Sequence, residues 1–364
     1  MGGVIVNEWI EQVGGAERVL DAVAAEFPDA QILCPWSDAP ERFPEGRVTE
    51  SWMARTPIRR HKALAIPFLL EHARRLPSQD VDWMLCMSHL FAHQARMRAA
   101  VGDVPKYVFT YSPARYIWNP EADRRGSGVL QRGVAGPLRT LDRRRAQEAV
   151  KIAAVSAFIA ARIERCWDRE STVIHPPVDV ATFMQNDDEL TAEEQRQLDS
   201  LPEGYLLGAS RFVLYKRLDL AIEAGVASGL PVVLAGDGPD LERLRAIAAE
   251  HPGLVTFVGR PSLPMLRALY RKALAFVFGP VEDFGIMPSE AMATGTPVVA
   301  NSIGGAAETV VDGVTGALFR STDAAELRRA VEVAAAADPA ACRSRAMEFD
   351  GSAFGTKISD WIGA

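Results

Sequence analysis

The sequence AFVFGPVEDFGIMPSEAMATGTPVVA fills residues 275–300 and contains a complete strand–helix–strand unit. The runs Ala275–Phe278 and Pro297–Ala300 are continuously apolar, a pattern typical of strands that are buried on both faces of a parallel sheet. Between them, Ser289–Thr294 is predicted to form a helix that Gly295 closes as a C-cap. This stretch therefore predicts an α/β fold built on parallel strands.

The same alternation of apolar runs and helical patterns continues through the chain. Further strands are expected at Tyr205–Ala209, Val232–Ala235 and Val255–Val258, and earlier at Val4–Val6, Gln31–Cys34, Val81–Met87, Tyr107–Thr110, Ile152–Val155 and Thr172–Ile174. Helices are expected at Ala16–Glu26, Ala157–Cys166, Leu218–Ser228, Leu241–Glu250, Leu263–Lys272 and Ala306–Val311. Such alternation indicates a doubly wound, Rossmann-like parallel sheet, here formed twice.

A polar stretch, Asp179–Gly204, separates the two series and is interpreted as a link with some helix in it. We therefore expect a first domain over residues 1–180 and a second over residues 181–348. Residues 349–364 carry apolar side chains at roughly helical spacing and are expected to cross back over the first domain. Ligands of such sheets bind at the carboxyl ends of the strands, so the loops there should carry the chemistry, in a cleft between the domains.

The composition is that of a globular protein with two domains. The chain has 364 residues, of which 48% are hydrophobic and 24% charged, which excludes disordered and fibrous classes. No run of about 18 apolar residues is present, and the opening MGGVIVNEWIEQ lacks the features of a signal peptide. The four cysteines, Cys34, Cys86, Cys166 and Cys342, form no C-x-x-C pair and are interpreted as reduced thiols. We expect a cytoplasmic protein.

The net charge of −7 is unevenly distributed. Residues 1–170 hold 24 Lys and Arg against 21 Asp and Glu, which leaves 16 and 26 for the rest of the chain. The excess lies in two basic segments, Arg55–Leu76 and Arg124–Lys151, which are either solvated surface or attracted to an anionic acceptor or acidic lipid. The prolines of Arg55–Leu76 are expected to break any long helix there. This segment is either a core-packing helix pair with a basic outer face or an interfacial segment near the acceptor.

Two carboxylates and a row of amides follow the strand Ala275–Phe278. Glu282 lies in the loop, and Glu290 is expected in the first turn of a helix that starts near Pro288. The free amides at this positive helix end can bind a phosphate. A sugar nucleotide needs such groups: acceptors for sugar and ribose hydroxyls, and donors for the diphosphate.

The loops after the other strands of the second half supply further candidates. Arg211 and Lys216 follow the strand Tyr205–Ala209 and could neutralise a departing diphosphate. The following loops carry Gly236-Asp-Gly-Pro239, Val258-Gly-Arg260 and Gly304-Gly305 before Glu308. Without these residues in the neighbouring loops, two glutamates eight residues apart would indicate only an acidic residue at a helix end and another on the surface.

These residues together resemble the retaining glycosyltransferases of family 4, which have the two-domain GT-B fold. The second half matches in Arg211, Lys216, the GDGP turn, Val258–Arg260, the Glu282/Glu290 pair and the glycines around Glu308. The first half matches in Gly14-Gly15, in Ser156-Ala-Phe-Ile and in residues 173–179, and Ser88-His89 and residues 111–119 resemble the branch of GDP-mannose-dependent mannosyltransferases. The family's usual histidine motif in the first domain is absent in its commonest form. The resemblance covers nearly the whole chain.

The resemblance implies a role for each matching residue. Glu282 would bind the donor sugar's hydroxyls and Glu290 the ribose, while Arg211 and Lys216 would hold the diphosphate. The other donor contacts implied are the amides of Phe284, Gly285 and Ile286, the base contacts of Val258, Gly259 and Arg260, and the close approach of Gly14 and Gly15. His89 could contact donor or acceptor, or be structural, and Tyr111 and Arg115 are acceptor-side candidates, Arg115 for a phosphate.

The resemblance also implies retention of anomeric configuration through a front-face reaction. We expect no divalent metal or other cofactor, because two cations would meet the diphosphate, and no nucleic-acid partner. The one D-x-D sequence, Asp80-Val-Asp82, is interpreted as a turn before a strand.

Several alternatives remain at this point. An oxidoreductase should show G-x-G-x-x-G, and Gly236–Leu241 lacks the third glycine. A nucleotide-sugar epimerase, a sugar phosphorylase or an inactive binding module could share the architecture. The donor base and sugar are open, with mannose from GDP-mannose favoured, and the acceptor is a lipid-linked glycan, another saccharide or a natural-product aglycone.

Overall fold

The computed structural model describes residues 2–12, 14–118, 129–185 and 189–363. The chain forms two compact units. Unit 1 comprises Met1–Pro177 and Ser352–Ala364, and unit 2 comprises Val178–Gly351. These limits lie three residues from each expected boundary. The difference from the expected boundaries has a local cause. Val178 pairs with Asp350 as a parallel bridge, so the two segments that connect the units are joined to each other and both belong to unit 2.

Unit 1 is built on a parallel sheet with the strand order β3-β2-β1-β4-β5-β6-β7. The strands are β1 (Gly3–Asn7), β2 (Gln31–Cys34), β3 (Val48–Glu50), β4 (Trp83–Ser88), β5 (Lys106–Thr110), β6 (Lys151–Ala154) and β7 (Thr172–Val173). Ile5 of β1 pairs with Ile32 on one side and Leu85 on the other, and all three side chains are buried. The sheet is therefore covered on both faces, as the continuous apolar runs predict.

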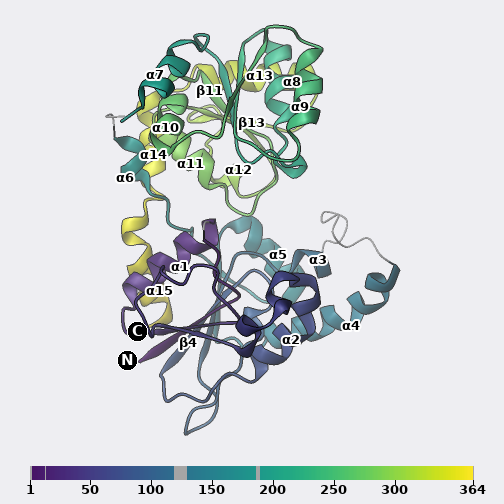
Figure 1. Ribbon diagram of the computed structural model, residues 1–364, viewed down its shortest axis with the longest axis vertical. Coiled ribbons are helices and arrows are strands. Elements are labelled where there is room, and N and C mark those ends of the chain that lie inside the picture. The colour runs from purple at the N-terminus through teal and green to yellow at the C-terminus, as the bar shows by residue number, and fades with distance from the viewer. Residues whose placement is uncertain (1, 13, 119–128, 186–188, 364) are drawn as a thin grey trace. The chain divides into compact units, whose positions relative to one another are not determined.

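The helices of unit 1 flank this sheet (Figure 1). They are α1 (Gly15–Glu26), α2 (Lys62–Arg74), α3 (Arg115–Trp118), α4 (Val129–Ala146), α5 (Ala157–Trp167) and α15 (Phe354–Ile362), with short 3-10 turns at Trp52–Arg55, Pro57–Arg60 and Ala92–Gln94. Ser156 caps α5 by accepting a hydrogen bond from the Ile159 amide. α15 packs against α1 and thereby closes unit 1 with a segment that follows unit 2 in the sequence.

The segment Arg55–Leu76 differs from the expectation. α2 continues through Pro67, although proline forfeits one backbone hydrogen bond of the helix. Ala65 and Leu69 are buried in a cluster with Trp36, and this packing outweighs the local cost.

Unit 2 repeats the architecture with the strand order β10-β9-β8-β11-β12-β13, again all parallel. Its strands are β8 (Leu206–Ala209), β9 (Val232–Ala235), β10 (Val255–Gly259), β11 (Ala275–Phe278), β12 (Val298–Asn301) and β13 (Gly316–Phe319). Its helices are α6 (Val180–Met184), α7 (Ala192–Asp199), α8 (Asp219–Ser228), α9 (Leu241–Ala249), α10 (Leu263–Lys272), α11 (Ile286–Ala293), α12 (Ala306–Thr309), α13 (Ala324–Ala335) and α14 (Pro339–Met347). The expected fold, two doubly wound parallel sheets, is confirmed.

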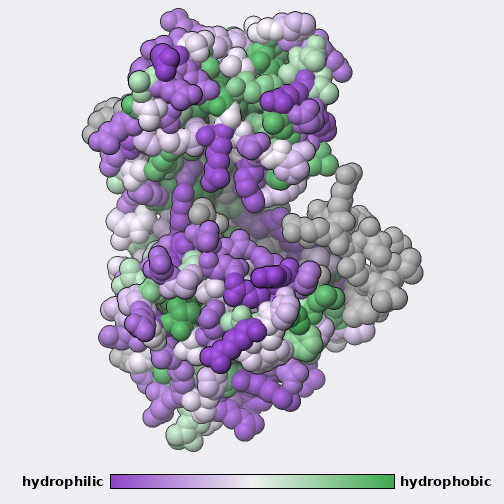
Figure 2. All heavy atoms as spheres, viewed as in Figure 1, coloured by the Kyte–Doolittle hydropathy of each residue, from purple (hydrophilic) through white to green (hydrophobic). Residues whose placement is uncertain are grey.

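The surface of each unit is mixed in character. On the face shown in Figure 2, hydrophobic residues are scattered among hydrophilic ones in both units. Isolated exposed apolar side chains are normal for a folded protein, so this view carries no functional argument by itself. No helix in the described part of the chain is long and apolar enough to cross a membrane.

Candidate functional site

The strand order of unit 2 places its candidate site between β8 and β11. Ligands of such sheets bind outside the carboxyl ends of the strands where the strand order reverses, and β8 and β11 lie on either side of that point. The loop after β8 carries Lys216, and the loop after β11 carries Glu282. The two side chains form an ion pair although they are 66 residues apart in sequence. Both are largely buried, with 13% and 22% of the side-chain surface exposed.

Glycine allows the loop after β12 to pack directly against the loop of Glu282. The Gly305 amide donates a hydrogen bond of 2.8 Å to the Glu282 carbonyl. A Cβ atom on Gly305 would lie 2.3 Å from the Phe284 Cα atom, closer than any real side chain approaches backbone. The Gly304-Gly305 pair therefore supports the backbone that carries Glu282.

Glycine serves the same purpose at the Gly236–Pro239 turn after β9. A Cβ atom on Gly236 would lie 1.9 Å from the Ser210 carbonyl oxygen, and one on Gly238 would lie 2.4 Å from that of Phe212. The Gly236 amide also donates to the Gly259 carbonyl at 2.6 Å. The loops after β8, β9 and β10 are thus joined through their backbones.

Within these joined loops, Arg211 is exposed and its Nη2 donates to the Tyr215 hydroxyl at 3.2 Å. Val258 and Gly259 end β10, and Arg260 is exposed just beyond it. These residues share the carboxyl edge with Lys216, whose ammonium group lies over the Tyr215 ring at 5.6 Å from its centroid.

α11 begins earlier than the sequence indicates. Gly285 is its N-cap in the left-handed conformation (φ 101°), and Ile286 is the first helical residue. Glu290 is therefore in the second turn, which corrects the expectation of a first-turn position. The Glu290 side chain is buried. The amides of Gly285 and Ile286 lie at the amino-terminal end of the helix. The Phe284 ring packs against the ring of Phe349.

In unit 1 the strand order reverses between β1 and β4. Gly14 and Gly15 begin α1 after β1, and His89 follows β4. The His89 ring meets Tyr111 and Trp9 edge-on, with ring centroids 6.3 and 4.9 Å apart. His89 and Tyr111 therefore lie together at the carboxyl edge, whereas Arg115 is exposed on α3.

Glu8 fixes the loop that presents His89. One of its carboxylate oxygens accepts hydrogen bonds from the amides of Leu90, Phe91 and Ala92 at 2.6–2.8 Å. The side chain is buried, so these amides supply the partners that a buried carboxylate requires. The sequence gives no signal for this contact because the partners lie more than 80 residues away.

Comparison with known proteins finds two family models that match in succession. Residues 13–182 match Glycosyltransferase Family 4, and residues 191–344 match Glycosyl transferases group 1. A GDP-mannose-dependent alpha-(1-6)-phosphatidylinositol monomannoside mannosyltransferase from Mycolicibacterium smegmatis is 30% identical over 266 residues, which cover 65% of this chain and 69% of that protein. The chain belongs to glycosyltransferase family 4.

Further relatives of this family 4 glycosyltransferase match over a shorter span. A D-inositol 3-phosphate glycosyltransferase from Mycobacterium sp. strain JLS is 34% identical over 185 residues, covering 48% of this chain. The match spans 42% of that relative, less than half of its length.

Solved structures show the same GT-B fold at low identity. Anabaena HepE in complex with UDP superposes with a TM-score of 0.70 and 17% identity, covering 100% of both chains. Sucrose-phosphate synthase from Thermosynechococcus elongatus gives a TM-score of 0.69 and 19% identity over 100% of this chain and 98% of that one.

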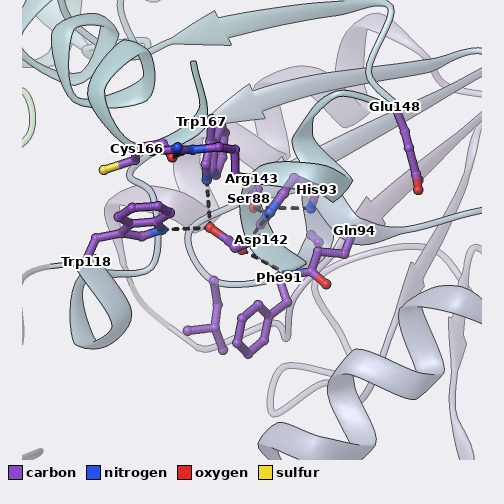
Figure 3. A network of polar contacts seen from close by, with 12 residues as sticks. Ser88, Phe91, His93, Gln94, Trp118, Asp142, Arg143, Glu148, Cys166 and Trp167 are labelled. Carbon is purple, nitrogen blue, oxygen red and sulfur yellow. Dashed lines mark hydrogen bonds and ion pairs between the residues drawn. The ribbon is translucent and has the colours of Figure 1, made fainter. Parts of the chain in front are cut away.

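Unit 1 of this family 4 glycosyltransferase also contains a buried polar network (Figure 3). The Asp142 carboxylate accepts hydrogen bonds from the indole nitrogens of Trp118 and Trp167 at 2.8 and 2.7 Å and from Gln94 at 2.9 Å. His93 Nε2 lies 3.0 Å from Asp142, and its Nδ1 lies 3.2 Å from the Ser88 hydroxyl. Burial would raise the pKa of Asp142, but His93 and the hydrogen bonds lower it below the usual range.

The contacts Ser88–His93–Asp142 resemble those of a hydrolase triad, although Nδ1 of His93 faces the serine and Nε2 the aspartate, and the burial of the network excludes that role. Ser88 and His93 are fully buried, so no substrate reaches the hydroxyl. The network instead ties α4 to β4, α3 and α5. Sequence analysis missed it, because the three residues follow no local spacing.

The remaining sequence features concern metal ligands, the D-x-D sequence and the second basic segment. No group of three metal-ligating side chains occurs within the described ranges. Asp82 precedes β4 and accepts a hydrogen bond from the Gly2 amide at 2.8 Å. Of the segment Arg124–Lys151, residues 124–128 lie outside the described residues, as does Asn119.

Proposed function

We propose that this protein transfers a hexose from a nucleotide-sugar donor to an acceptor hydroxyl with retention of configuration. The Lys216–Glu282 pair at the strand-order reversal of unit 2 carries the proposal. It places an ammonium group and a carboxylate together where doubly wound sheets bind ligands. A nucleotide sugar presents the complementary groups, since its diphosphate is anionic and its sugar hydroxyls are donors.

In this proposal, donor binding replaces the ion pair by two new contacts. The diphosphate takes over the Lys216 ammonium, and the released Glu282 carboxylate accepts the sugar's hydroxyls. As the glycosidic bond breaks, negative charge grows on the diphosphate, and Lys216, Arg211 and the amides of Gly285 and Ile286 stabilise it. These fixed positive groups do the work that a divalent ion does elsewhere, so no metal is required.

The remaining unit 2 residues have binding roles in the proposal. Glu290 accepts from the ribose hydroxyls, and Val258, Gly259 and Arg260 contact the base. The M. smegmatis relative, named as GDP-mannose-dependent, supports mannose from GDP-mannose as the donor. In unit 1, Gly14 and Gly15 allow a phosphate to approach the backbone closely, and His89 and Tyr111 orient the acceptor.

A donor panel tests the proposal by thermal shift with GDP, UDP, ADP and dTDP and their sugars. A ligand at 100 times its dissociation constant adds about 2.7 kcal/mol of stability, so the matching nucleotide gives a clear rise in the melting temperature of unit 2. Guanine nucleotides are expected to give it. If no nucleotide shifts the transition, the proposed function is wrong. A product assay then separates transfer from epimerase, phosphorylase or inactive binding, because only transfer extends the acceptor.

We also propose that the protein is cytoplasmic and contacts the inner face of the membrane through the Arg55–Leu76 surface. Trp52 and Phe68 are exposed and meet edge-on at 5.7 Å, and Leu64 is exposed on the same helix as Phe68. Arg55 and Arg60 are exposed in the same segment, and basic residues near exposed apolar ones suit an anionic interface. Flotation with vesicles containing phosphatidylglycerol tests this. Binding at low salt that is lost in Phe68→Ser supports the contact, and absence of binding overturns it.

A further inference from the structure

Arg217 takes a backbone conformation that residues other than glycine rarely adopt. Its φ is 51° and its ψ is 43°, in the left-handed region, where the Cβ atom crowds the following carbonyl oxygen. Within the described ranges, Asp168 is the one other non-glycine residue with a positive φ, and it ends α5, where a left-handed residue is common. Arg217 ends only the short 3-10 turn Leu214–Lys216 in the loop after β8. Its conformation therefore needs contacts that hold it.

The backbone of Arg217 is fixed by its neighbours in the loop and by the end of another strand. Its amide donates to the Leu214 carbonyl at 3.2 Å, and its carbonyl accepts from the Leu220 amide at 3.1 Å. Gly279, the residue after β11, packs directly against it, because a Cβ atom on Gly279 would lie 3.0 Å from the Arg217 carbonyl oxygen and 3.1 Å from its Cβ atom. The left-handed residue therefore joins the loop after β8 to the strand that leads to Glu282.

The side chain of Arg217 adds a second anchor. Its Nε donates to both carboxylate oxygens of Asp219, at 3.2 and 3.1 Å. Asp219 is the first residue of α8, and only 11% of its side chain is exposed, so its carboxylate is a fixed partner. Arg243 lies 3.5 Å from Asp219 and donates two hydrogen bonds of 2.8 Å to Asp240, which directly follows the Gly236–Pro239 turn. Glycine could adopt the same backbone conformation, but it has no side chain to anchor in this way.

These contacts fix the backbone next to Lys216. The Lys216 amide donates to the Val213 carbonyl at 2.9 Å, so the chain is held on both sides of the Lys216 Cα atom. A lysine side chain is flexible and ends in a compact charge, which stabilises a growing negative charge only if it points there. In the free protein, 13% of the side chain is exposed and the ammonium pairs with Glu282. A fixed backbone limits the other directions that this side chain can take.

We infer that Arg217 is a positioning residue for Lys216. Its left-handed backbone, anchored by Asp219, directs the lysine ammonium toward Glu282 in the free protein and toward the donor diphosphate during transfer. Such positioning matters because misplacement of a reacting group by about 1 Å can lower a rate about a hundredfold. The pairing with Glu282 is independent of any reaction, whereas the effect on transfer rests on the proposed function.

Two substitutions of Arg217 separate the contribution of the backbone from that of the side chain. Arg217→Val removes the anchor and also disfavours the left-handed conformation, which β-branched residues rarely adopt. Arg217→Gly removes the anchor but adopts the conformation freely. The matched control is Arg245→Val, which removes an exposed ion pair with Glu242 on α9.

The first readout is the rate at which acetic anhydride labels the Lys216 amine in the full chain without nucleotide. Peptide mapping by mass spectrometry gives this rate, with the exposed Lys357 as the internal reference. The ion pair with Glu282 protects Lys216 in the wild type. We expect labelling to be about two- to fivefold faster in Arg217→Val, as loss of a partly exposed ion pair implies. Arg217→Gly should show a smaller increase and the control no change.

The second readout is kcat for transfer, measured in a double-mutant cycle with Lys216→Ala. Arg217→Val should lower kcat by about tenfold or more in the otherwise unchanged protein and no further in the Lys216→Ala background. A role in the fold alone would lower kcat by the same factor in both backgrounds. Calorimetric melting shows whether unit 2 of each variant is folded, and if Arg217→Val does not fold, Arg217→Gly takes its place in both readouts.

Faster labelling of Lys216 together with a non-additive cycle supports the inference. Unchanged labelling in both Arg217 variants, or a loss of kcat that is absent or equal in the two backgrounds, overturns it. If labelling is unchanged but the wild type transfers sugar, the proposed function stands and Arg217 has no such role. If labelling changes as expected but the wild type transfers sugar from no donor, Arg217 positions Lys216 and the proposed function is wrong.

Discussion

At the residue scale, the Lys216–Glu282 ion pair keeps two opposite charges together at the carboxyl edge of unit 2. Each side chain satisfies the other while no ligand is bound, so neither partly buried charge is left without a counterion. A ligand that binds both groups must break this ion pair and offer each group a more favourable interaction partner. The pair therefore favours molecules with an anion and hydroxyls in fixed relation over simple anions.

Substitution of either partner should impair turnover. We expect Glu282→Gln and Lys216→Ala each to lower kcat at least tenfold, which corresponds to about 1.4 kcal/mol or more in the activation barrier. The double variant should lose less than the sum of the two, because the side chains are in contact. Steady-state transfer assays measure this, with Lys272→Ala as the control, an exposed lysine at the end of α10 that pairs with Asp199 at 3.8 Å. Unchanged rates in both single variants would remove the proposed roles.

Glu148 makes the stability of unit 1 depend on pH in the acidic range. Burial would raise the pKa of Glu148, but Arg74, Lys106 and Arg145 lower it to about 2. Its carboxylate stabilises the fold above the ordinary pKa of about 4.3, and this contribution is lost as the pH falls toward 2. We therefore expect Glu148→Gln to be less stable than the wild type at pH 7 and to lose less stability between pH 6 and pH 3.

Urea unfolding followed by tryptophan fluorescence measures this change. All seven tryptophans lie in unit 1, so the signal reports that unit alone. Glu242→Gln is the control, because Glu242 is an exposed residue of α9 in unit 2. Parallel pH profiles for Glu148→Gln and the wild type would contradict the assignment.

The sequence allowed the site residues to be chosen but not their contacts. Lys216 and Glu282 each follow an apolar strand, so their place at a carboxyl edge could be predicted. Their direct pairing could not, because it depends on β8 and β11 being neighbours. The hydrogen bonds of Glu8 and Asp142 could not be predicted for the same reason, since their partners are distant in sequence.

At the element scale, the loops of unit 2 depend on glycine for their close backbone contacts. Gly305→Ala places a Cβ atom 2.3 Å from the Phe284 Cα atom, so the two loops must separate. We expect a loss of about 1–3 kcal/mol, the usual cost of overpacking, together with weaker nucleotide binding. Calorimetric melting of unit 2 with and without nucleotide measures both effects.

Gly136→Ala is the matched control for this substitution. Gly136 lies in α4, and a Cβ atom there meets nothing within 4 Å. Alanine favours the helix by up to about 1 kcal/mol over glycine, so this variant should be as stable as the wild type or more so. If Gly305→Ala behaves like Gly136→Ala, the loops are not held together as described.

Most elements were predictable because their cores are continuous apolar runs. Gln31–Cys34, Val232–Ala235 and Ala275–Phe278 were placed with their observed ends. β3 and β13 were missed, because Val48–Glu50 is short and mostly exposed and β13 begins with a glycine. The start of α11 was missed because the left-handed Gly285 begins the helix ahead of Pro288.

At the scale of the whole molecule, unit 1 is completed by a helix from beyond unit 2. Phe354, Ile358 and Ile362 of α15 are buried, and Phe354 meets Phe109 edge-on at 5.8 Å. Burial of a large apolar side chain contributes about 1.5–3 kcal/mol, so these three side chains carry a large share of the stability of unit 1.

A chain that ends after Gly351 should therefore lose unit 1 selectively. We expect its tryptophan-monitored transition to shift to much lower urea, while nucleotide still raises the melting temperature of unit 2. The milder Ile358→Ala should move the same transition part of the way, by about 2–5 kcal/mol. A truncated chain whose fluorescence transition matches that of the full chain would show that α15 is dispensable.

The path of the chain also sets an order of events on the ribosome. Nascent domains generally fold as units as they emerge, the N-terminal one first. Here the sheet of unit 1 emerges first but lacks α15 until residues 178–351 have been translated. The apolar surface that α15 covers on α1 is therefore uncovered throughout that interval, so a chaperone that shields it would act on a chain whose second unit is already folding.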